Sequence, residues 1–151
     1  MRLVLMMGLP YSGKTTWALD QGVPIVSPDA IRRAFHGERF LEKAEPWIWT
    51  ATYTMAEALA EAGHETVIVD ATHTKAKRRQ PWVERFPDAE ILVAQVRTQS
   101  NECTRRAHLA GDFDILPIID RMAQDWEEPL GKPIRGSDGR VTYVAIQEVS
   151  A

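Results

Sequence analysis

The feature that most constrains the fold is the passage from an apolar run into a glycine-rich loop near the N-terminus. Residues 3–7, LVLMM, show no alternation of polar and apolar side chains, which is typical of a parallel strand buried on both faces. The pattern Gly8-x-x-x-x-Gly13-Lys14-Thr15 follows at once and leads into a helix-like stretch. This is the spacing of a phosphate-binding loop, in which backbone N–H groups and a helix N-terminus surround phosphate oxygens. The sequence therefore predicts a nucleoside triphosphate site.

The residue types in this loop predict how ATP and Mg²⁺ bind. Lys14 would reach the β- and γ-phosphates, and the Thr15 hydroxyl would hold Mg²⁺. The alternative is a simple strand-to-helix turn, but the apolar run before the loop and the helix start after it favour phosphate binding. The residues expected to contact ATP are Gly8, Leu9, Pro10, Tyr11, Ser12, Gly13, Lys14, Thr15 and Thr16.

Strand-like and helix-like segments alternate along the chain. The alternation predicts a three-layer α/β fold, with a mostly parallel central sheet of about five strands flanked by helices. At 151 residues the chain has the length of one domain, residues 1–151. Expected strands span residues 2–7, 24–27, 65–70, 90–97 and, at the C-terminal edge, 141–147. Expected helices span residues 14–20, 29–36, 44–62, 75–85, 100–110 and 118–127.

Two smaller patterns concern the expected helix at 44–62 and a turn near the C-terminus. In the helix at 44–62, Ile48, Met55, Leu59 and Ala62 share one face that would be buried. Trp47, Trp49 and Tyr53 lie on the same helix and either stack on a base or pack in the interior. Near the C-terminus, Asp138-Gly139 predicts the turn of a β-hairpin.

Composition limits the possible environment and partners. The single cysteine, Cys103, excludes an intramolecular disulfide and suits a reducing compartment, so we expect a cytoplasmic protein without a disulfide-linked partner. No apolar stretch approaches the ~18 residues of a membrane span, and the N-terminal residues run directly into the phosphate loop rather than forming a signal peptide. The net charge of −3 argues against a dedicated nucleic-acid-binding protein, although a local basic patch is compatible with it.

A carboxylate and an arginine follow the second expected strand. Ligands of open α/β sheets bind beyond the carboxyl ends of the strands, so Asp29 falls on the functional edge of the sheet. Arg32, three residues later, shares a helix face with it. Asp29 could accept the proton of an attacking hydroxyl while Arg32 holds the acceptor. Alternatively, Asp29 caps the helix and Arg32 is solvated.

The third expected strand also ends in a carboxylate, Asp70. This residue would order Mg²⁺ or its waters, or else form a turn into Thr72. A basic cluster, Lys75, Lys77, Arg78 and Arg79, comes one turn later. Such a run is either a solvated helix face or, because it lies beside the predicted site, an acceptor-phosphate site formed by Arg78 and Arg79.

Four segments in this order resemble the phosphate-loop kinase module of the polynucleotide 5′-hydroxyl kinases. They are GLPYSGKTTW, the D-x-x-R of residues 29–32, VIVDATHTKAKRR, and ECTRRAH followed by LP and DRM, which together span roughly residues 1–130. The resemblance implies that Asp29 is the general base on the 5′-hydroxyl and that Arg32 binds the 3′ phosphate of the acceptor. It also implies that Asp70 organises the active site and contacts the acceptor.

The segment at about 100–117 corresponds to the lid of that family, with one departure. The resemblance implies that Arg106 binds ATP and takes part in catalysis together with Lys14 and Asp29. The family usually carries a second arginine just before a glycine, and here Ala110 occupies that position before Gly111.

Three functions are compatible with these patterns. The first is an ATP- and Mg²⁺-dependent kinase acting on the 5′-hydroxyl of a polynucleotide. The second is a kinase of a small molecule such as a nucleoside, sugar or antibiotic. The third is an ATP-binding module without phosphotransfer, which the missing lid arginine keeps open.

Overall fold

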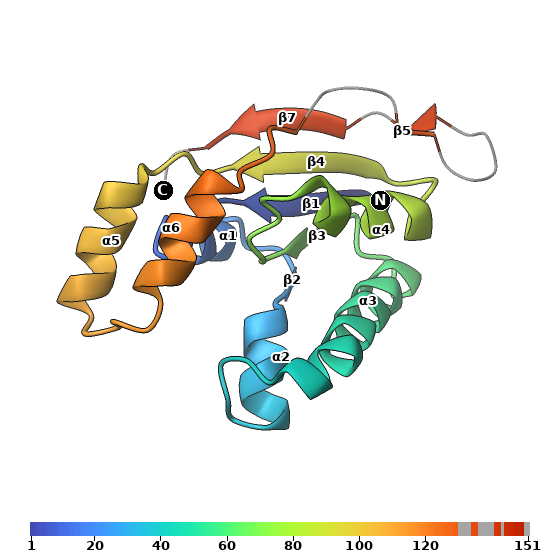
Figure 1. Cartoon of the computed structure of the whole chain (residues 1–151). Coiled ribbons are helices and arrows are strands. Elements are labelled where there is room, and N and C mark those ends of the chain that lie inside the picture. Colours follow the sequence, from blue (N-terminus) through green and yellow to red (C-terminus); the bar gives the residue numbers. More distant parts are fainter. Residues whose placement is uncertain (130–133, 136–140, 143, 150–151) are drawn as a thin grey trace.

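The computed structural model describes residues 1–129, 134–135, 141–142 and 144–149 and contains one main parallel sheet. Its strands lie in the order β2-β3-β1-β4-β7, and every pairing between neighbours is parallel (Figure 1). The strands are β1 (Arg2–Met7), β2 (Ile25–Val26), β3 (Thr66–Val69), β4 (Glu90–Gln95) and β7 (Val144–Glu148). The predicted α/β fold with a parallel sheet flanked by helices is confirmed.

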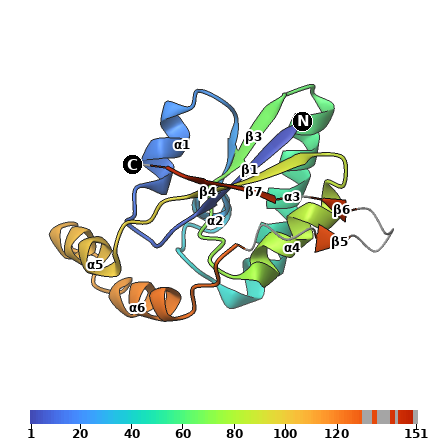
Figure 2. The same ribbon diagram turned by 90° about the horizontal axis from the view of Figure 1, so that it is seen from above.

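Helices cover both faces of this sheet (Figure 2). One face of β1 packs against α1, and the opposite face packs against α3 and α4. The helices are α1 (Lys14–Asp20), α2 (Pro28–Phe35), α3 (Glu45–Glu61), α4 (Ala76–Arg85), α5 (Ser100–Leu109) and α6 (Leu116–Gln124), with a short 3₁₀ turn η1 (Glu42–Ala44) before α3. None of these described helices combines the length and hydrophobicity that crossing a bilayer demands.

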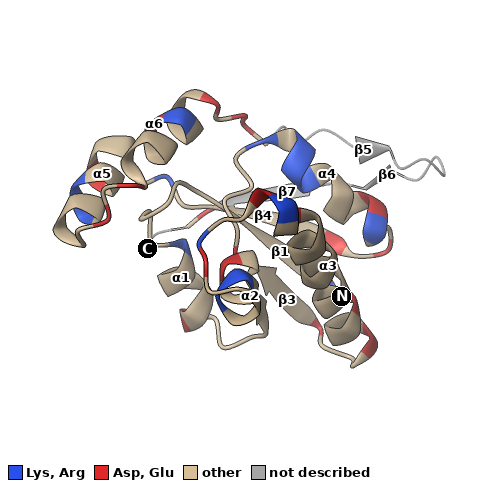
Figure 3. Ribbon diagram, turned by 60° about the horizontal axis from the view of Figure 1, so that its bottom comes forward, with Lys and Arg blue, Asp and Glu red and all other residues tan. Residues whose placement is uncertain are grey.

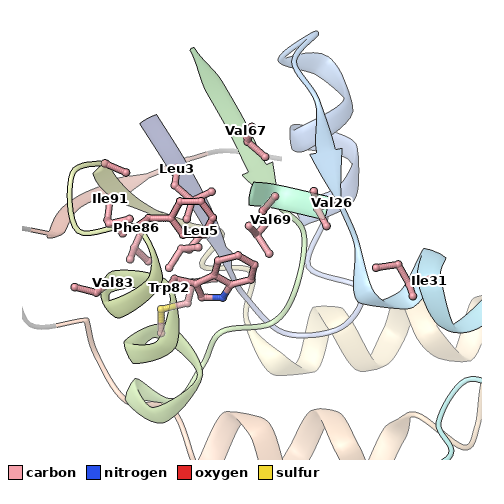
Figure 4. Close-up of a cluster of buried hydrophobic side chains, with 14 of the residues drawn as sticks. Leu3, Leu5, Val26, Ile31, Val67, Val69, Trp82, Val83, Phe86 and Ile91 are labelled. Carbon is pink, nitrogen blue, oxygen red and sulfur yellow. The ribbon is translucent and has the colours of Figure 1, made fainter. Parts of the chain in front are cut away.

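The apolar run of β1 supplies both halves of the core. Successive strand residues point to opposite faces, so Leu3, Leu5 and Met7 enter one cluster, while Val4 and Met6 enter the other. Figure 4 shows the larger cluster, in which side chains of α4 pack against those of the strands; its labelled residues include Trp82, Val83 and Phe86. Burial on both faces explains why the run has no polar alternation.

The carboxyl ends of the strands face the loop after β1 and the helices α5 and α6 (Figure 1). In Figure 1 the arrowheads of β1, β4 and β7 point toward α5 and α6, which lie side by side. These two helices form a third cluster with Leu9 of the phosphate loop, which includes Cys103, Ala107, Ile115 and Ile119. The segment that resembles the lid is therefore packed against the phosphate loop.

The predicted buried face of α3 needs correction. The buried residues of α3 are Ile48, Thr52 and Ala56, because the inward face follows a spacing of four. Met55 is 47% exposed, and Ala62 at the end of the helix is exposed as well. The Thr52 hydroxyl can be buried because it donates to the Ile48 carbonyl oxygen at 2.7 Å. Other helix and strand ends shift by a few residues.

The expected strand at 141–147 divides between two sheets. Residues Val141–Thr142 form β6, which pairs antiparallel with β5 (Ile134–Arg135), and β7 alone joins the main sheet at its β4 edge. The predicted hairpin turn at 138–139 lies outside the described residues.

Candidate active site

The phosphate loop joins β1 to α1 through two positions where only glycine is favourable. Gly13 has a φ of 100°, in the left-handed region that residues with a Cβ avoid. At Gly8, a Cβ would lie 2.7 Å from the Ser12 hydroxyl, which is closer than packed atoms allow, and 3.0 Å from the Val96 carbonyl oxygen, which is a tight contact. Tyr11 also has a positive φ, 63°. The loop is therefore tightly folded, and its backbone surrounds a small space.

Lys14 is positioned by the same loop. Its Nζ donates a hydrogen bond to the Leu9 carbonyl oxygen at 2.7 Å, and only 8% of the residue is exposed. Burial lowers the lysine pKa from 10.5 to about 8, although the charges of Asp70 and Asp29 act in the opposite direction. The ammonium group is thus held in a site that lacks a full counter-charge, as expected for a residue that binds phosphate.

Thr15 and Asp70 meet at the entrance to α1. The Thr15 hydroxyl donates to Asp70 Oδ2 at 2.7 Å, and Asp70 directly follows β3, the neighbour of β1. Within the described part of the chain, no three His, Cys, Asp or Glu side chains are grouped closely enough to chelate a metal alone. A hydroxyl and one carboxylate beside the predicted triphosphate site suit Mg²⁺, which protein side chains hold with the help of phosphates and water.

A cavity of about 680 Å³ opens in front of these residues. Lys14, Thr15 and Asp70 line it, and so does Asp29 from α2. The other lining residues are Pro10, Tyr11, Arg33, Gly37, Arg39, Ala71, Thr72, Asp112 and Ile115. We call this the donor cavity. Of the residues predicted to contact ATP, Pro10, Tyr11, Lys14 and Thr15 line this cavity, together with Asp70 and Asp29.

A second cavity of about 420 Å³ lies beside the first, and we call it the acceptor cavity. Both cavities are lined by Asp29. Arginines enter the acceptor cavity from α2, α4 and α6, and Figure 3 shows basic stretches on these three helices. Its charged residues are Asp29, Arg32, Arg39, Glu45, Arg78 and Arg121, and its apolar and aromatic residues include Trp49, Phe40 and Met122.

The structure distinguishes the two roles considered for Asp29. The helix cap of α2 is Ser27, whose hydroxyl accepts a hydrogen bond from Ala30 N–H at 3.3 Å. Asp29 lies in the first helical turn, and its side chain is 69% exposed toward solvent. Its Oδ1 accepts from the Arg32 guanidinium at 2.5 Å. The capping alternative is therefore wrong, and the carboxylate is available to a ligand.

Arg32 is held more tightly than the sequence indicated. Its Nε and NH2 groups donate to both carboxylate oxygens of Glu45 at 2.7 Å, and its side chain is only 12% exposed. The hydrogen bonds to Glu45 raise the Arg32 pKa, and the same contacts lower the Glu45 pKa. Arg32 keeps a place in the acceptor cavity, but any acceptor phosphate would share it with Glu45 and Asp29.

The two arginines of the basic cluster have different surroundings. Arg78 is exposed, lines the acceptor cavity and lies over the Trp49 ring, 5.2 Å from its centroid. Arg79 is buried and donates to the His73 carbonyl oxygen at 2.6 Å and the Glu127 carbonyl oxygen at 3.1 Å. It lines neither cavity, so this placement argues against the acceptor contact predicted for Arg79.

Arg106 approaches the phosphate loop from the lid but does not enter either cavity. Its NH1 donates to the carbonyl oxygens of Tyr11 and Ser12 at 3.2 and 3.4 Å, and its Nε donates to Glu102 at 2.8 Å. In this arrangement Arg106 supports the loop backbone. An ATP contact from Arg106, as predicted, requires its guanidinium to leave these partners.

Sequence reasoning missed a buried histidine that fixes the loop after β3. The Trp82 indole N–H donates to His73 Nε2 at 3.1 Å, so Nδ1 carries the proton and donates to the Met6 carbonyl oxygen at 2.8 Å. Burial lowers the histidine pKa to about 4, and the ring stays neutral. His73 thereby ties the segment that follows Asp70 to the end of β1.

The sequence also gave no sign of a contact across the donor cavity. Asp112, in the turn between α5 and α6, accepts hydrogen bonds from Arg39 at 2.8 and 2.5 Å and from the Tyr11 hydroxyl at 2.9 Å. These residues come from three separate loops with no repeating pattern, so spacing along the chain could not indicate their proximity.

The comparisons with known proteins agree with this fold and this loop. A family model described as an AAA domain matches residues 3–111. No curated protein sequence matches the chain significantly. A chain of the Pnkp1/Rnl/Hen1 complex is 24% identical, with a TM-score of 0.64; the match covers 70% of this chain and 39% of that one. The present chain therefore spans well under half of that relative's length.

Two further structures match over nearly all of this chain. A gluconokinase from Sinorhizobium meliloti 1021 is 21% identical, with a TM-score of 0.61. The match covers 98% of this chain and 82% of the gluconokinase chain. The Mycobacterium tuberculosis APS kinase CysC, in complex with AMPPNP and APS, is 18% identical, with a TM-score of 0.63. The match covers 99% of this chain and 87% of the APS kinase chain. The fold is thus that of phosphate-loop kinases. With the family match across the phosphate loop, β3, β4 and α5, the chain belongs to the AAA-domain family.

Proposed function

We propose that the protein is an ATP-dependent kinase that transfers the γ-phosphoryl group to a hydroxyl acceptor. The observation that carries this proposal is the position of Asp29, which lines both the donor cavity and the acceptor cavity. A hydroxyl in the acceptor cavity would give its proton to the Asp29 carboxylate. Its oxygen would then bond to the γ-phosphorus as the bond to the β–γ bridging oxygen breaks and ADP leaves.

The remaining residues of the donor cavity suit the charges of this reaction. Lys14 would contact the β- and γ-phosphates, because its ammonium group is buried beside the loop without a full counter-charge. Thr15 and Asp70 would hold Mg²⁺, which would neutralise phosphate charge. Arg32 would orient the Asp29 carboxylate through the hydrogen bond at 2.5 Å.

We propose the 5′-hydroxyl end of a polynucleotide as the acceptor. The acceptor cavity presents four arginines against two acidic residues, an excess that suits phosphate. Trp49, at the same cavity, offers an aromatic surface on which a base could stack. A volume of about 420 Å³ suits a terminal nucleotide rather than a long strand. One similar chain comes from a structure entitled the Pnkp1/Rnl/Hen1 RNA repair complex.

A small-molecule acceptor is the second candidate, and the pairing of Arg32 favours it. Glu45 already satisfies two donors of this guanidinium, which reduces its capacity to hold an acceptor phosphate. The gluconokinase and the APS kinase also match this chain along nearly its whole length. A sugar or nucleoside without phosphates would need fewer free arginines.

The test is transfer of labelled phosphate from ATP to 5′-hydroxyl oligonucleotides and, in parallel, to a panel that includes gluconate, APS and nucleosides. KM for the oligonucleotide is then measured between about 50 and 200 mM salt, where lost phosphate contacts have large effects. The variant Arg78→Ala should raise KM and reduce the slope of log KM against log salt by about one. KM for ATP should remain nearly unchanged.

Arg85→Ala provides the matched control. Arg85 belongs to the same helix and lies over Tyr53, 4.6 Å from the ring centroid, but it lines neither cavity. Its loss should leave the salt slope unchanged. Phosphorylation of a panel metabolite, with no transfer to any oligonucleotide, would refute the polynucleotide acceptor and support the small-molecule one.

A further inference from the structure

The donor and acceptor cavities share a short boundary where the phosphoryl group must pass. The residues that line both are Asp29, Arg39, Ala71, Thr72 and Ile115. Among the described residues at this boundary, Arg39 has the only positively charged side chain. The phosphoryl group in transfer carries negative charge spread over its three equatorial oxygens, and in the proposed reaction it passes this same boundary. A cation placed here would act on the transferred group rather than on the rest of either substrate.

Arg39 already has the contacts of a residue that binds an oxyanion. Its two terminal nitrogens donate to the two carboxylate oxygens of Asp112 at 2.8 and 2.5 Å, in the forked geometry that guanidinium also offers to phosphate. The Arg39 side chain is 54% exposed, so it can turn without disturbing the core. Asp112 would still have a donor after Arg39 leaves, because the Tyr11 hydroxyl is 2.9 Å away.

Both arginines of the lid segment are engaged elsewhere, since Arg105 donates to the two carboxylate oxygens of Glu102 at 2.7 and 2.8 Å. The Arg106 guanidinium is occupied by Glu102 and by two carbonyl oxygens of the phosphate loop, and it lines neither cavity. The other cation of the donor cavity besides Lys14 and Arg39 is Arg33, which does not reach the acceptor cavity. Arg39 is therefore the arginine best placed between donor and acceptor.

We propose that Arg39 is a phosphate-binding catalytic residue, which leaves Asp112 and contacts the transferred phosphoryl group when ATP is bound. This inference rests on the proposed kinase function. In the absence of nucleotide, Asp112 keeps the guanidinium at the cavity and Arg39 offsets the carboxylate charge that would otherwise face the triphosphate. The γ-phosphate then replaces Asp112 as the partner of Arg39.

The test compares binding of AMPPNP and of ADP by calorimetry, because these nucleotides differ in the γ-phosphate. Arg39→Ala should weaken AMPPNP binding about 10-fold or more, the scale of a charge-assisted hydrogen bond, and ADP binding by less than about 3-fold. Arg39→Lys should give an intermediate AMPPNP affinity, because the charge remains and the fork is lost. Under saturating substrates, Arg39→Ala should lower kcat about 100-fold or more.

Two further variants control this experiment. Arg85→Ala removes another half-exposed arginine, paired with Glu57 at 2.9 Å, and should change neither affinity. Asp112→Asn keeps the size of the side chain but no longer competes for Arg39, so AMPPNP should bind severalfold more tightly than to the parent. Thermal unfolding of each variant shows whether it is folded.

The outcomes separate this inference from the proposed function. Equal weakening of AMPPNP and ADP by Arg39→Ala, or no weakening of either, would overturn the phosphate contact. Weaker AMPPNP binding in Asp112→Asn would overturn the release of Arg39 from Asp112. A parent protein that shows Arg39-dependent preference for AMPPNP but phosphorylates no acceptor would support the contact and refute the kinase. A parent protein that binds no AMPPNP would overturn both.

Discussion

Replacing Lys14 by methionine should make the ATP-free protein more stable while abolishing its activity. The lysine pKa of about 8, against an ordinary value of 10.5, means that burial disfavours the charged form by about 3 kcal/mol. Methionine has similar length and carries no charge, so it should remove this cost. It also removes the hydrogen bond from Nζ to the Leu9 carbonyl oxygen at 2.7 Å, worth about 1 kcal/mol. That oxygen keeps a second donor, the Ser12 N–H at 3.2 Å.

The net expectation is a gain of about 2 kcal/mol in the free energy of unfolding at pH 7, or about 4–8 °C in Tm for a chain of this length. The difference between parent and variant should also depend on pH. Below about pH 8, the lysine is charged in both the folded and the unfolded parent, so the cost is constant. Between about pH 8 and 10.5, the folded parent releases its proton first, and its stability rises with pH relative to the variant.

The assay is urea unfolding of both proteins without nucleotide, at several pH values from 7 to 10. Taking the difference between them cancels the titration of all groups that they share. A variant that is less stable than the parent at pH 7, or a difference that does not change with pH, would refute the claim that Lys14 is buried at an energetic cost. Phosphate transfer and AMPPNP binding by the same samples would report the functional loss.

Four other substitutions test the remaining parts of the site. Asp29→Asn should lower kcat about 100-fold or more with little change in ATP affinity or Tm, because Ser27 caps the helix; a fall in Tm with activity per folded molecule preserved would contradict this. Thr15→Ala should raise the Mg²⁺ concentration needed for half-maximal transfer, and Asp70→Asn should do the same; an unchanged Mg²⁺ titration would place the metal elsewhere. Gly8→Ala should abolish AMPPNP binding measured by calorimetry, because its Cβ would meet the Ser12 hydroxyl at 2.7 Å; near-normal affinity would show that the loop can relax.

The sequence predicted the parts of the site that follow parallel strands. An apolar run fixes the position of a buried strand, and the carboxyl ends of neighbouring parallel strands meet at one edge of the sheet. Lys14 and Thr15 follow β1, and Asp70 follows the neighbouring β3, so local pattern and sheet rules were enough to place them together. Asp29 was found in the same way, after β2.

The rest depends on side-chain direction and on contacts between loops, which spacing does not encode. A run of basic residues does not tell which member turns inward, so Arg78 at the cavity and Arg79 in the interior looked equivalent. Arg39 and Asp112 meet only because the turns that carry them fold over the same cavity. Glu45 lies on a different helix from Arg32, and the pairing of these two residues required the packing of α2 on α3 to be known.

The position of β1 in the sheet has a consequence for how the chain folds. Arg2 at the start of β1 is in register with Thr66 on one side and with Glu90 on the other, so both neighbours of this strand come from much later in the sequence. Closing such long loops costs entropy before the contacts stabilise the chain, and folds dominated by distant pairings form slowly. The segment that carries the phosphate loop is synthesised before both strands that pair with β1. It can be fixed in place only after β3 and β4 have been synthesised, and until then its apolar run is exposed.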